Sequence, residues 1–249
     1  MKRQVISPRM ALRALPSSVV SRSSRLFLLA CAALLAPRTM AADSGVTTKL
    51  GFESAYVSYG TKFSENTFVP MLDAFHGDYY AGIWGYLPIE KGGGGYVFDG
   101  EWDFFAGRTV KLNKLVSLDL GGTIYQYPGV TTDAVTFEGF VWLNLELPLK
   151  PKLKLYYDFT ISNWIGEVMI AHSVPLTKKT AFSFSGHYGF RQPHASDAWF
   201  YGTVKADWVY SITEKSQFSL GVRGTNNTDR ASVGHGFEAW YGTAFGYSW

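Results

Sequence analysis

The chain has 249 residues, 47% of them hydrophobic, and a formal net charge of +3. Seven of its 23 basic residues and none of its 20 acidic ones fall within residues 1–41, so the remainder holds 16 basic against 20 acidic residues. The positive charge is therefore a property of the N-terminal segment, and it does not indicate a nucleic-acid partner.

Residues 1–41 have the features of a secretory signal peptide. A basic stretch precedes the apolar run 26–36, which is too short to cross a bilayer as a helix. Small residues at Thr39, Ala41 and Ala42 predict cleavage after Ala41 or Ala42. Cys31, the only cysteine, lies within the apolar run. It is compatible with a lipoprotein processing site, but the run continues past it, which favours ordinary cleavage. A mature chain without cysteine excludes a disulfide framework and a cysteine metal site.

After residue 47 the dominant pattern is alternation of apolar and polar residues in segments separated by turn residues. In 153–161, for example, the odd positions are apolar and the even positions are polar or amphipathic. All 26 glycines and every aromatic residue except Phe27 lie after residue 41, as suits a β-protein with aromatic belts. The sequence predicts an all-β fold, a transmembrane antiparallel up-and-down β-barrel of about twelve strands, occupying residues 42–249 as one domain. The expected strands are 47–60, 66–76, 78–88, 95–108, 114–127, 133–147, 152–163, 166–176, 180–191, 197–212, 215–225 and 235–249.

The connections between these strands alternate in length, as expected of outer-membrane barrels. Those near 76–78, 109–114, 148–151, 177–179 and 213–215 are predicted to be periplasmic turns. Those near 60–66, 88–95, 128–133, 162–166, 192–197 and 225–234 are predicted to be extracellular loops. A soluble β-sandwich or a lipocalin-like barrel would also alternate, but each buries its apolar face inward, and an eight-stranded barrel would leave much of this length unused.

The chain ends on an amphipathic aromatic segment. Phe245, Tyr247 and Trp249 continue the alternate positions of Phe237 and Tyr241. We interpret these last three aromatics as the signal that the barrel-assembly machinery recognises, and we expect them to face lipid at the periplasmic end.

Two segments near the front carry a family resemblance. The sequence GFESAYVSYG at 51–60, followed by DYYAGIWG at 78–85, resembles the opening of the TorF family of porin-like outer-membrane proteins. The resemblance covers about 40 residues, and at 58–60 the chain lacks the arginine of the family pattern. It implies a small bacterial outer-membrane barrel and supplies no catalytic residue.

Projection of the strands predicts a polar lumen that is rich in acids. The predicted pore-lining residues are Glu101, Asp103, Asp119, Glu138, Lys154, Asp158, Glu167, His187, Lys205, Asp207, Arg223 and Glu238, and Glu53, Asp99, Glu146 and Arg191 are assigned to the same face. Carboxylates in a water-filled pore would favour small cationic or neutral polar solutes. The alternative is that acids and bases pair across a narrow lumen and close it.

The remaining function classes are an adhesive or structural barrel and a barrel hydrolase. A hydrolase would need a histidine beside a serine, as at His187 with Ser183 and Ser185, or at His172 with Ser173. Neither pair forms a recognisable motif, and the glycine run 92–95 lacks the lysine and helix of a phosphate loop. The sequence thus predicts a porin, not an enzyme, with no cofactor and no metal. Its expected partners are outer-membrane lipid, the barrel-assembly machinery and small polar solutes.

Overall fold

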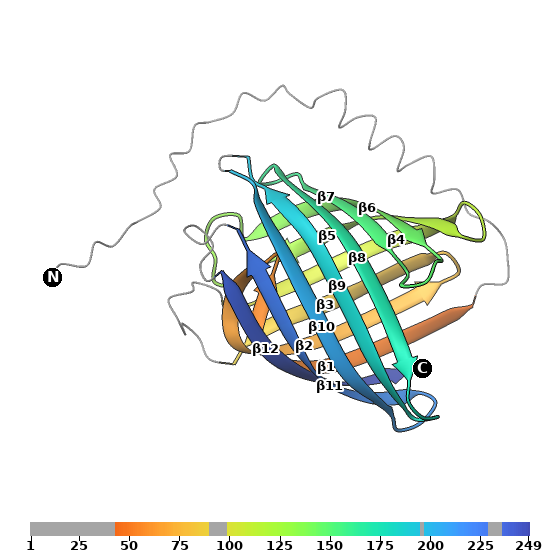
Figure 1. Ribbon diagram of the computed structural model, residues 1–249. Helices are drawn as coiled ribbons and strands as arrows, with labels where there is room; N and C mark the ends of the chain where they lie inside the picture. Colours follow the sequence, from red (N-terminus) through yellow and green to blue (C-terminus); the bar gives the residue numbers. More distant parts are fainter. Residues whose placement is uncertain (1–42, 90–98, 195–196, 229–235) are drawn as a thin grey trace. The chain divides into compact units, whose positions relative to one another are not determined.

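A computed structural model of the chain describes residues 43–89, 99–194, 197–228 and 236–249. These residues form twelve antiparallel strands in one closed barrel, in which each strand pairs with its neighbours in sequence and β1 pairs with β12 (Figure 1). The strands are β1 Ser44–Ser58, β2 Thr61–His76, β3 Tyr79–Pro88, β4 Glu101–Lys111, β5 Val116–Gln126, β6 Val135–Leu145, β7 Lys152–Asp158, β8 Asn163–Pro175, β9 Thr180–Gln192, β10 Trp199–Ser211, β11 Ser216–Asn227 and β12 Phe237–Ser248. The predicted fold class and strand number are confirmed.

The alternation in the sequence becomes an inner and an outer face of the barrel wall. On β10, Tyr201 is 1% exposed and its hydroxyl donates to Glu167 of the lumen, whereas Val204 is 64% exposed on the outside. Most buried side chains are polar, and many large apolar side chains lie on the outside. This distribution is the reverse of that in a lipocalin-like barrel or a soluble sandwich, so it excludes both alternatives.

Closure of the barrel satisfies the backbone groups that an open sheet would leave at its edges. Thr47 pairs with Ser248 and Glu53 with Gly242, and the Trp249 amide donates to the Val46 carbonyl at 2.9 Å. No helix among the described residues is long and apolar enough to cross a membrane.

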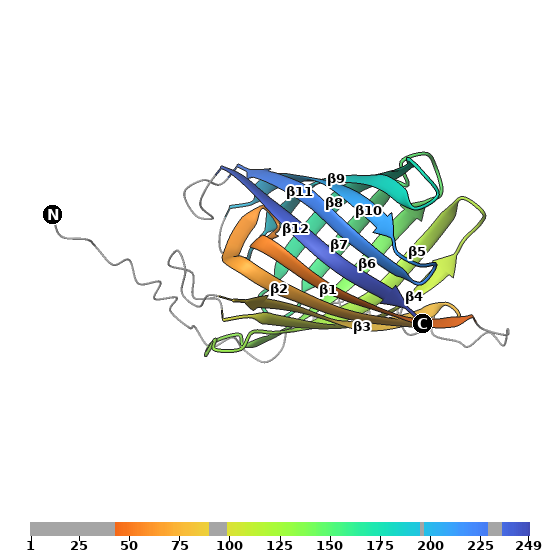
Figure 2. The same ribbon diagram turned by 90° about the horizontal axis from the view of Figure 1, so that it is seen from below.

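The two ends of the barrel differ in their connections (Figure 2). The end that carries Ser44 and Trp249, here called the turn end, has connections at 77–78, 112–115, 146–151, 176–179 and 212–215. The opposite loop end has connections at 59–60, 89–100, 127–134, 159–162, 193–198 and 228–236. The predicted grouping of the connections at two opposite ends of the barrel is confirmed, and the assignment of these ends to the periplasmic and extracellular sides stays a prediction. The predicted signal peptide, Cys31 and the glycine run 92–95 lie outside the described residues.

One connection was predicted wrongly. In place of a loop over 60–66, β1 and β2 are joined by a tight turn at Tyr59 and Gly60, and β2 begins at Thr61. Both turn residues have positive φ, 50° at Tyr59 and 75° at Gly60, which is the backbone geometry of the tightest hairpin turns. The polar residues after Gly60, interpreted as a loop, are instead the start of a strand.

Candidate functional site: the barrel lumen

The barrel encloses a cavity of about 990 Å³ to which every strand contributes side chains. Its lining extends from Thr47 and Phe75 near the turn end to Asp133 and Asn163 near the loop end. The cavity is thus a long internal space between the two ends of the barrel.

Most of the predicted pore-lining residues line this cavity. They are Glu101, Asp103, Glu138, Lys154, Asp158, Glu167, His187, Lys205, Asp207 and Arg223. Asp119 accepts hydrogen bonds from Thr109 and Asn144, and Glu238 is bonded to Lys62. Whether any of these side chains meets a passing solute stays a prediction.

Two acids of the predicted lumen face lie elsewhere. Asp99 precedes β4 in the connection at the loop end, and Glu146 follows β6 in a connection at the turn end, and both are exposed. The predicted strand 95–108 begins before β4 does, and the predicted strand 133–147 ends after β6 does. Asp99 and Glu146 were therefore assigned to the lumen face by alternation, although they belong to connections. Glu53 and Arg191 do line the cavity.

The carboxylates of β4 to β7 are satisfied by neutral donors. Glu101 accepts from the Tyr56 hydroxyl at 3.1 Å, and Glu138 accepts from the Tyr125 hydroxyl at 2.8 Å. Asp158 accepts from two backbone amides that follow it. The ion pairs formed by the described residues include none of these acids, nor Asp103. This part of the wall therefore holds its acids without a paired cation.

Two cations of the lumen, Arg223 on β11 and Lys154 on β7, form ion pairs with acids. The Arg223 guanidinium lies 2.7 Å from Asp207 Oδ1 and 3.2 Å from Glu53 Oε2. Lys154 lies 3.5 Å from Glu167 Oε2 and 5.1 Å from the centre of the Trp142 ring. These pairs cancel charge locally. The lining of the cavity contains more acidic than basic side chains.

The loop end of the β1–β2 hairpin departs from the barrel wall. Pairing of β1 with β12 ends at Glu53, and pairing of β2 with β3 begins at Thr67, so residues 54–65 pair only with each other. The register shifts between Tyr56 and Val57, an irregularity that bends a hairpin. Figure 2 shows this end of β1 and β2, in orange, curling toward the barrel interior. We call residues 54–65 the hairpin tip.

The turn at the end of the hairpin tip is bound by residues of β9 to β11. The Trp199 indole donates to the Tyr59 carbonyl at 3.2 Å, and the Asn227 amide donates to the Gly60 carbonyl at 2.6 Å. The Tyr59 ring lies 5.6 Å from the Arg191 guanidinium and meets Tyr201 edge to face at 5.9 Å. Sequence reasoning missed these contacts, because alternation assigns a face to Tyr59 but does not show that the hairpin leaves the wall.

The base of the hairpin tip is held to the adjoining wall. Tyr56 stacks on Tyr86 of β3 with ring centres 4.1 Å apart, and Lys62 lies 2.8 Å from Glu238 of β12. The hairpin tip is thus attached on its own side of the barrel as well as at its end.

The two histidines that the sequence placed beside serines, His187 and His172, make other contacts in the structure. His187 lines the lumen and contacts the Tyr201 ring, while Ser183 is hydrogen-bonded to Ser173. Across the part of the chain that the structure describes, no hydrogen bond joins His187 or His172 to a serine, and no cluster of His, Cys, Asp and Glu has the arrangement of a metal site. The catalytic interpretation therefore receives no geometric support.

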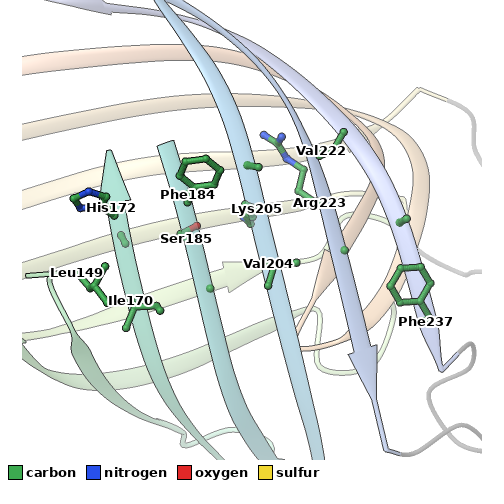
Figure 3. Close-up of a pocket in the computed structure, with 15 residues that line it drawn as sticks. Leu149, Ile170, His172, Phe184, Ser185, Val204, Lys205, Val222, Arg223 and Phe237 are labelled. Atoms are coloured by element: carbon green, nitrogen blue, oxygen red, sulfur yellow. The ribbon is translucent and has the colours of Figure 1, made fainter. Parts of the chain in front are cut away.

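His172 lies in a shallow groove on the outer surface of the barrel (Figure 3). The groove, of about 620 Å³, follows β8 to β12 and is lined by exposed apolar side chains such as Ile170 and Val204. Gly186 also lines the groove, and the space at this position would accommodate a Cβ. Exposed apolar side chains on the outer wall are suited to contact with lipid.

Comparisons with known proteins give the fold and no family. No family model matches the chain, and no curated protein matches it in sequence. Among solved structures it is similar to the KdgM porin in complex with disordered oligogalacturonate, at a TM-score of 0.55 and 9% identity over 82% of this chain and 99% of that one. A second KdgM porin structure gives 0.53 at 10% identity, over 82% and 99% of the two chains. The NanC porin gives 0.50 at 10% identity, over 82% and 98%. The chain therefore has the fold of these outer-membrane porins.

Proposed function

We propose that this chain is a channel of the bacterial outer membrane that passes small polar solutes by diffusion and favours cations. The observation that carries the proposal is the closed barrel with an apolar outer surface and a cavity lined by carboxylates that have no cationic partner. The fold shared with the KdgM and NanC porins supports a porin-like channel, and the TorF resemblance agrees with it. No hydrolytic activity is proposed.

The preference for cations follows from the charge of the inner wall. Glu101, Asp103 and Glu138 face the cavity from β4 and β6, and none of the three forms an ion pair with a cation of the described residues. A carboxylate that keeps its charge lowers the energy of a cation in the adjacent water and raises that of an anion.

Planar bilayers under a salt gradient test both parts of the proposal. The purified barrel should produce discrete conductance steps with a reversal potential on the cation-selective side. The Glu101→Gln/Asp103→Asn variant should move that potential toward zero, while Glu214→Gln, in an exposed turn, should not. Absence of steps from barrels that migrate normally in heat-modifiability gels would contradict the channel, and anion selectivity would contradict the role of the carboxylates.

A non-conducting barrel is the second candidate, because the hairpin tip occupies part of the lumen. In that case the outer surface would carry the function, as in an adhesive or structural barrel. The same recordings separate the two, since a barrel closed by its hairpin tip would be silent.

The proposed partners follow from the outer surface and the C-terminus. Phe245 on β12 and Trp249, which follows it, are exposed, and this exposure supports the proposed contact with lipid. We assign Phe245, Tyr247 and Trp249 to recognition by the barrel-assembly machinery. Loss of Trp249 should then lower the amount of folded barrel in the outer membrane without altering the conductance of the molecules that do assemble.

A further inference from the structure

We infer that the hairpin tip sets the solute size limit of the channel, with the Tyr59 ring as its central obstruction. This inference rests on the proposed channel function and names the element that selects among neutral solutes of different size. The hairpin tip is inferred to limit the size of the solute, whereas the carboxylates are proposed to select its charge. The size limit and the ion selectivity can therefore be tested separately.

The Tyr59 ring reaches the far side of the bore. In a closed ring of twelve consecutive strands β7 lies opposite β1, and Tyr59 packs against the buried cluster of Phe140, Tyr156 and Ile165 on β6, β7 and β8. The same ring contacts Arg191 of β9. A hairpin that starts on one wall and touches the opposite wall must divide the cross-section through which a solute passes.

The position of the hairpin tip is determined by side chains and not by the barrel ladder. Beyond Glu53 and before Thr67 neither strand pairs with the wall, and the turn is held by the Trp199 and Asn227 donors. Gly60 fits closely there, since a Cβ on it would lie 3.1 Å from Asn227 Cβ. This close fit gives the hairpin tip a defined position, and the ladders of β1 with β12 up to Glu53 and of β2 with β3 from Thr67 do not include it.

Because Tyr59 lies in the turn and takes no part in the barrel ladder, removal of its ring should enlarge the passage and leave the barrel intact. Porins commonly select solutes by the narrowest cross-section of the lumen and the groups that line it. A neutral solute near the size limit should therefore respond more strongly to loss of the ring than a small ion does.

Single-channel recording and liposome swelling with sugars of increasing size test the inference. The Tyr59→Ala variant should conduct roughly twice as much as the wild type and admit sugars that the wild type excludes. Tyr59→Phe, which keeps the ring, should behave as the wild type. Tyr188→Ala is the matched control, because that ring is 61% exposed on the outer wall.

A thiol reagent tests the location of the ring separately. The described residues contain no cysteine, so Tyr59→Cys introduces a unique thiol among them. A cationic methanethiosulfonate added to the conducting channel should reduce the current of Tyr59→Cys and leave that of Tyr188→Cys unchanged. Heat-modifiable migration shows that each variant has folded.

The outcomes distinguish this inference from the channel proposal. A conducting wild type whose conductance and size limit are unchanged in Tyr59→Ala would overturn the inference and leave the channel standing. A silent wild type with a conducting Tyr59→Ala variant would support the inference and show that the native hairpin tip closes the barrel. Silence of both would overturn both.

Discussion

The two sides of the inner wall hold their charges in different ways. On the side formed by β10, β11 and β1, Arg223 lies between Asp207 and Glu53, within 2.7 and 3.2 Å of their oxygens. On the side formed by β4 to β6, Asp119 and Glu138 accept hydrogen bonds from hydroxyl and amide groups. We call these the paired side and the unpaired side.

The difference between the two sides predicts that one contributes mainly to the stability of the barrel and the other mainly to the ion selectivity of the channel. A cation between two carboxylates satisfies them and cancels their charge, so the paired side adds to the strength of the wall and little to the field in the lumen. A hydroxyl donor satisfies a carboxylate without cancelling its charge. We therefore expect substitutions of acids on the unpaired side to change ion selectivity most, and removal of the cation on the paired side to lower stability most.

The largest expected effect is that of Arg223→Met. The substitution leaves Glu53 and Asp207 facing each other without their shared cation, and it should lower the free energy of unfolding by about 3 kcal/mol, toward the lower end for buried pairs. The lower end applies because the two carboxylates are 27% and 22% exposed. Urea denaturation in detergent micelles, followed by tryptophan fluorescence, measures the change, with Lys215→Met in an exposed turn as control.

An unchanged urea midpoint for Arg223→Met would contradict the distinction between the two sides. It would mean that water already solvates the two carboxylates on the paired side, so that they do not need the cation. The reversal potential of the same variant provides a second measurement. It should move further to the cation-selective side, since two carboxylates lose their cation.

The sequence predicted the strands and their directions because alternation and turn residues are local signals. The alternation in 153–161 predicted the strand β7, although the strand ends at Asp158, and Tyr241 and Phe245 lie on the outer face of β12 as predicted. It did not predict that Arg223 would meet Glu53, because β12 lies between their two strands and the meeting depends on register and side-chain length.

The hairpin tip could not be predicted for a related reason. The alternation at 54–65 is compatible with a strand in the wall, and the departure from it depends on partners at Trp199 and Asn227, far away in the sequence. The turn itself had a local signal, the glycine at position 60, which is one of the residues that tight hairpin turns favour. The polar residues that follow it outweighed that signal.

An intermediate effect is expected for Lys154→Met, on β7 between the two sides. Glu167 loses a cation at 3.5 Å and the Trp142 ring loses its cation contact, but Glu167 keeps the Tyr201 hydroxyl at 2.8 Å. The free energy of unfolding should fall by about 1 kcal/mol. Lys152→Met on the same strand has no ion pair to lose among the described residues and is the matched control. A loss as large as that of Arg223→Met would show that Lys154 belongs to the paired side.

The smallest effect on stability is expected for Glu138→Gln. This variant gives the most direct test of the difference between the unpaired side and the paired side. In the wild type the Tyr125 hydroxyl lies 2.8 Å from the Glu138 carboxylate, and glutamine keeps a carbonyl oxygen that can accept this hydrogen bond. The substitution removes a buried carboxylate that has no cationic partner. The free energy of unfolding should change by less than about 0.5 kcal/mol, or rise, because the lost charge no longer has to be desolvated. The matched substitution Glu53→Gln on the paired side takes one of two carboxylates from Arg223, so its urea midpoint should fall clearly. Equal losses for the two variants would mean that Glu138 has a compensating cation after all, and the reversal potential of Glu138→Gln would then stay at the wild-type value.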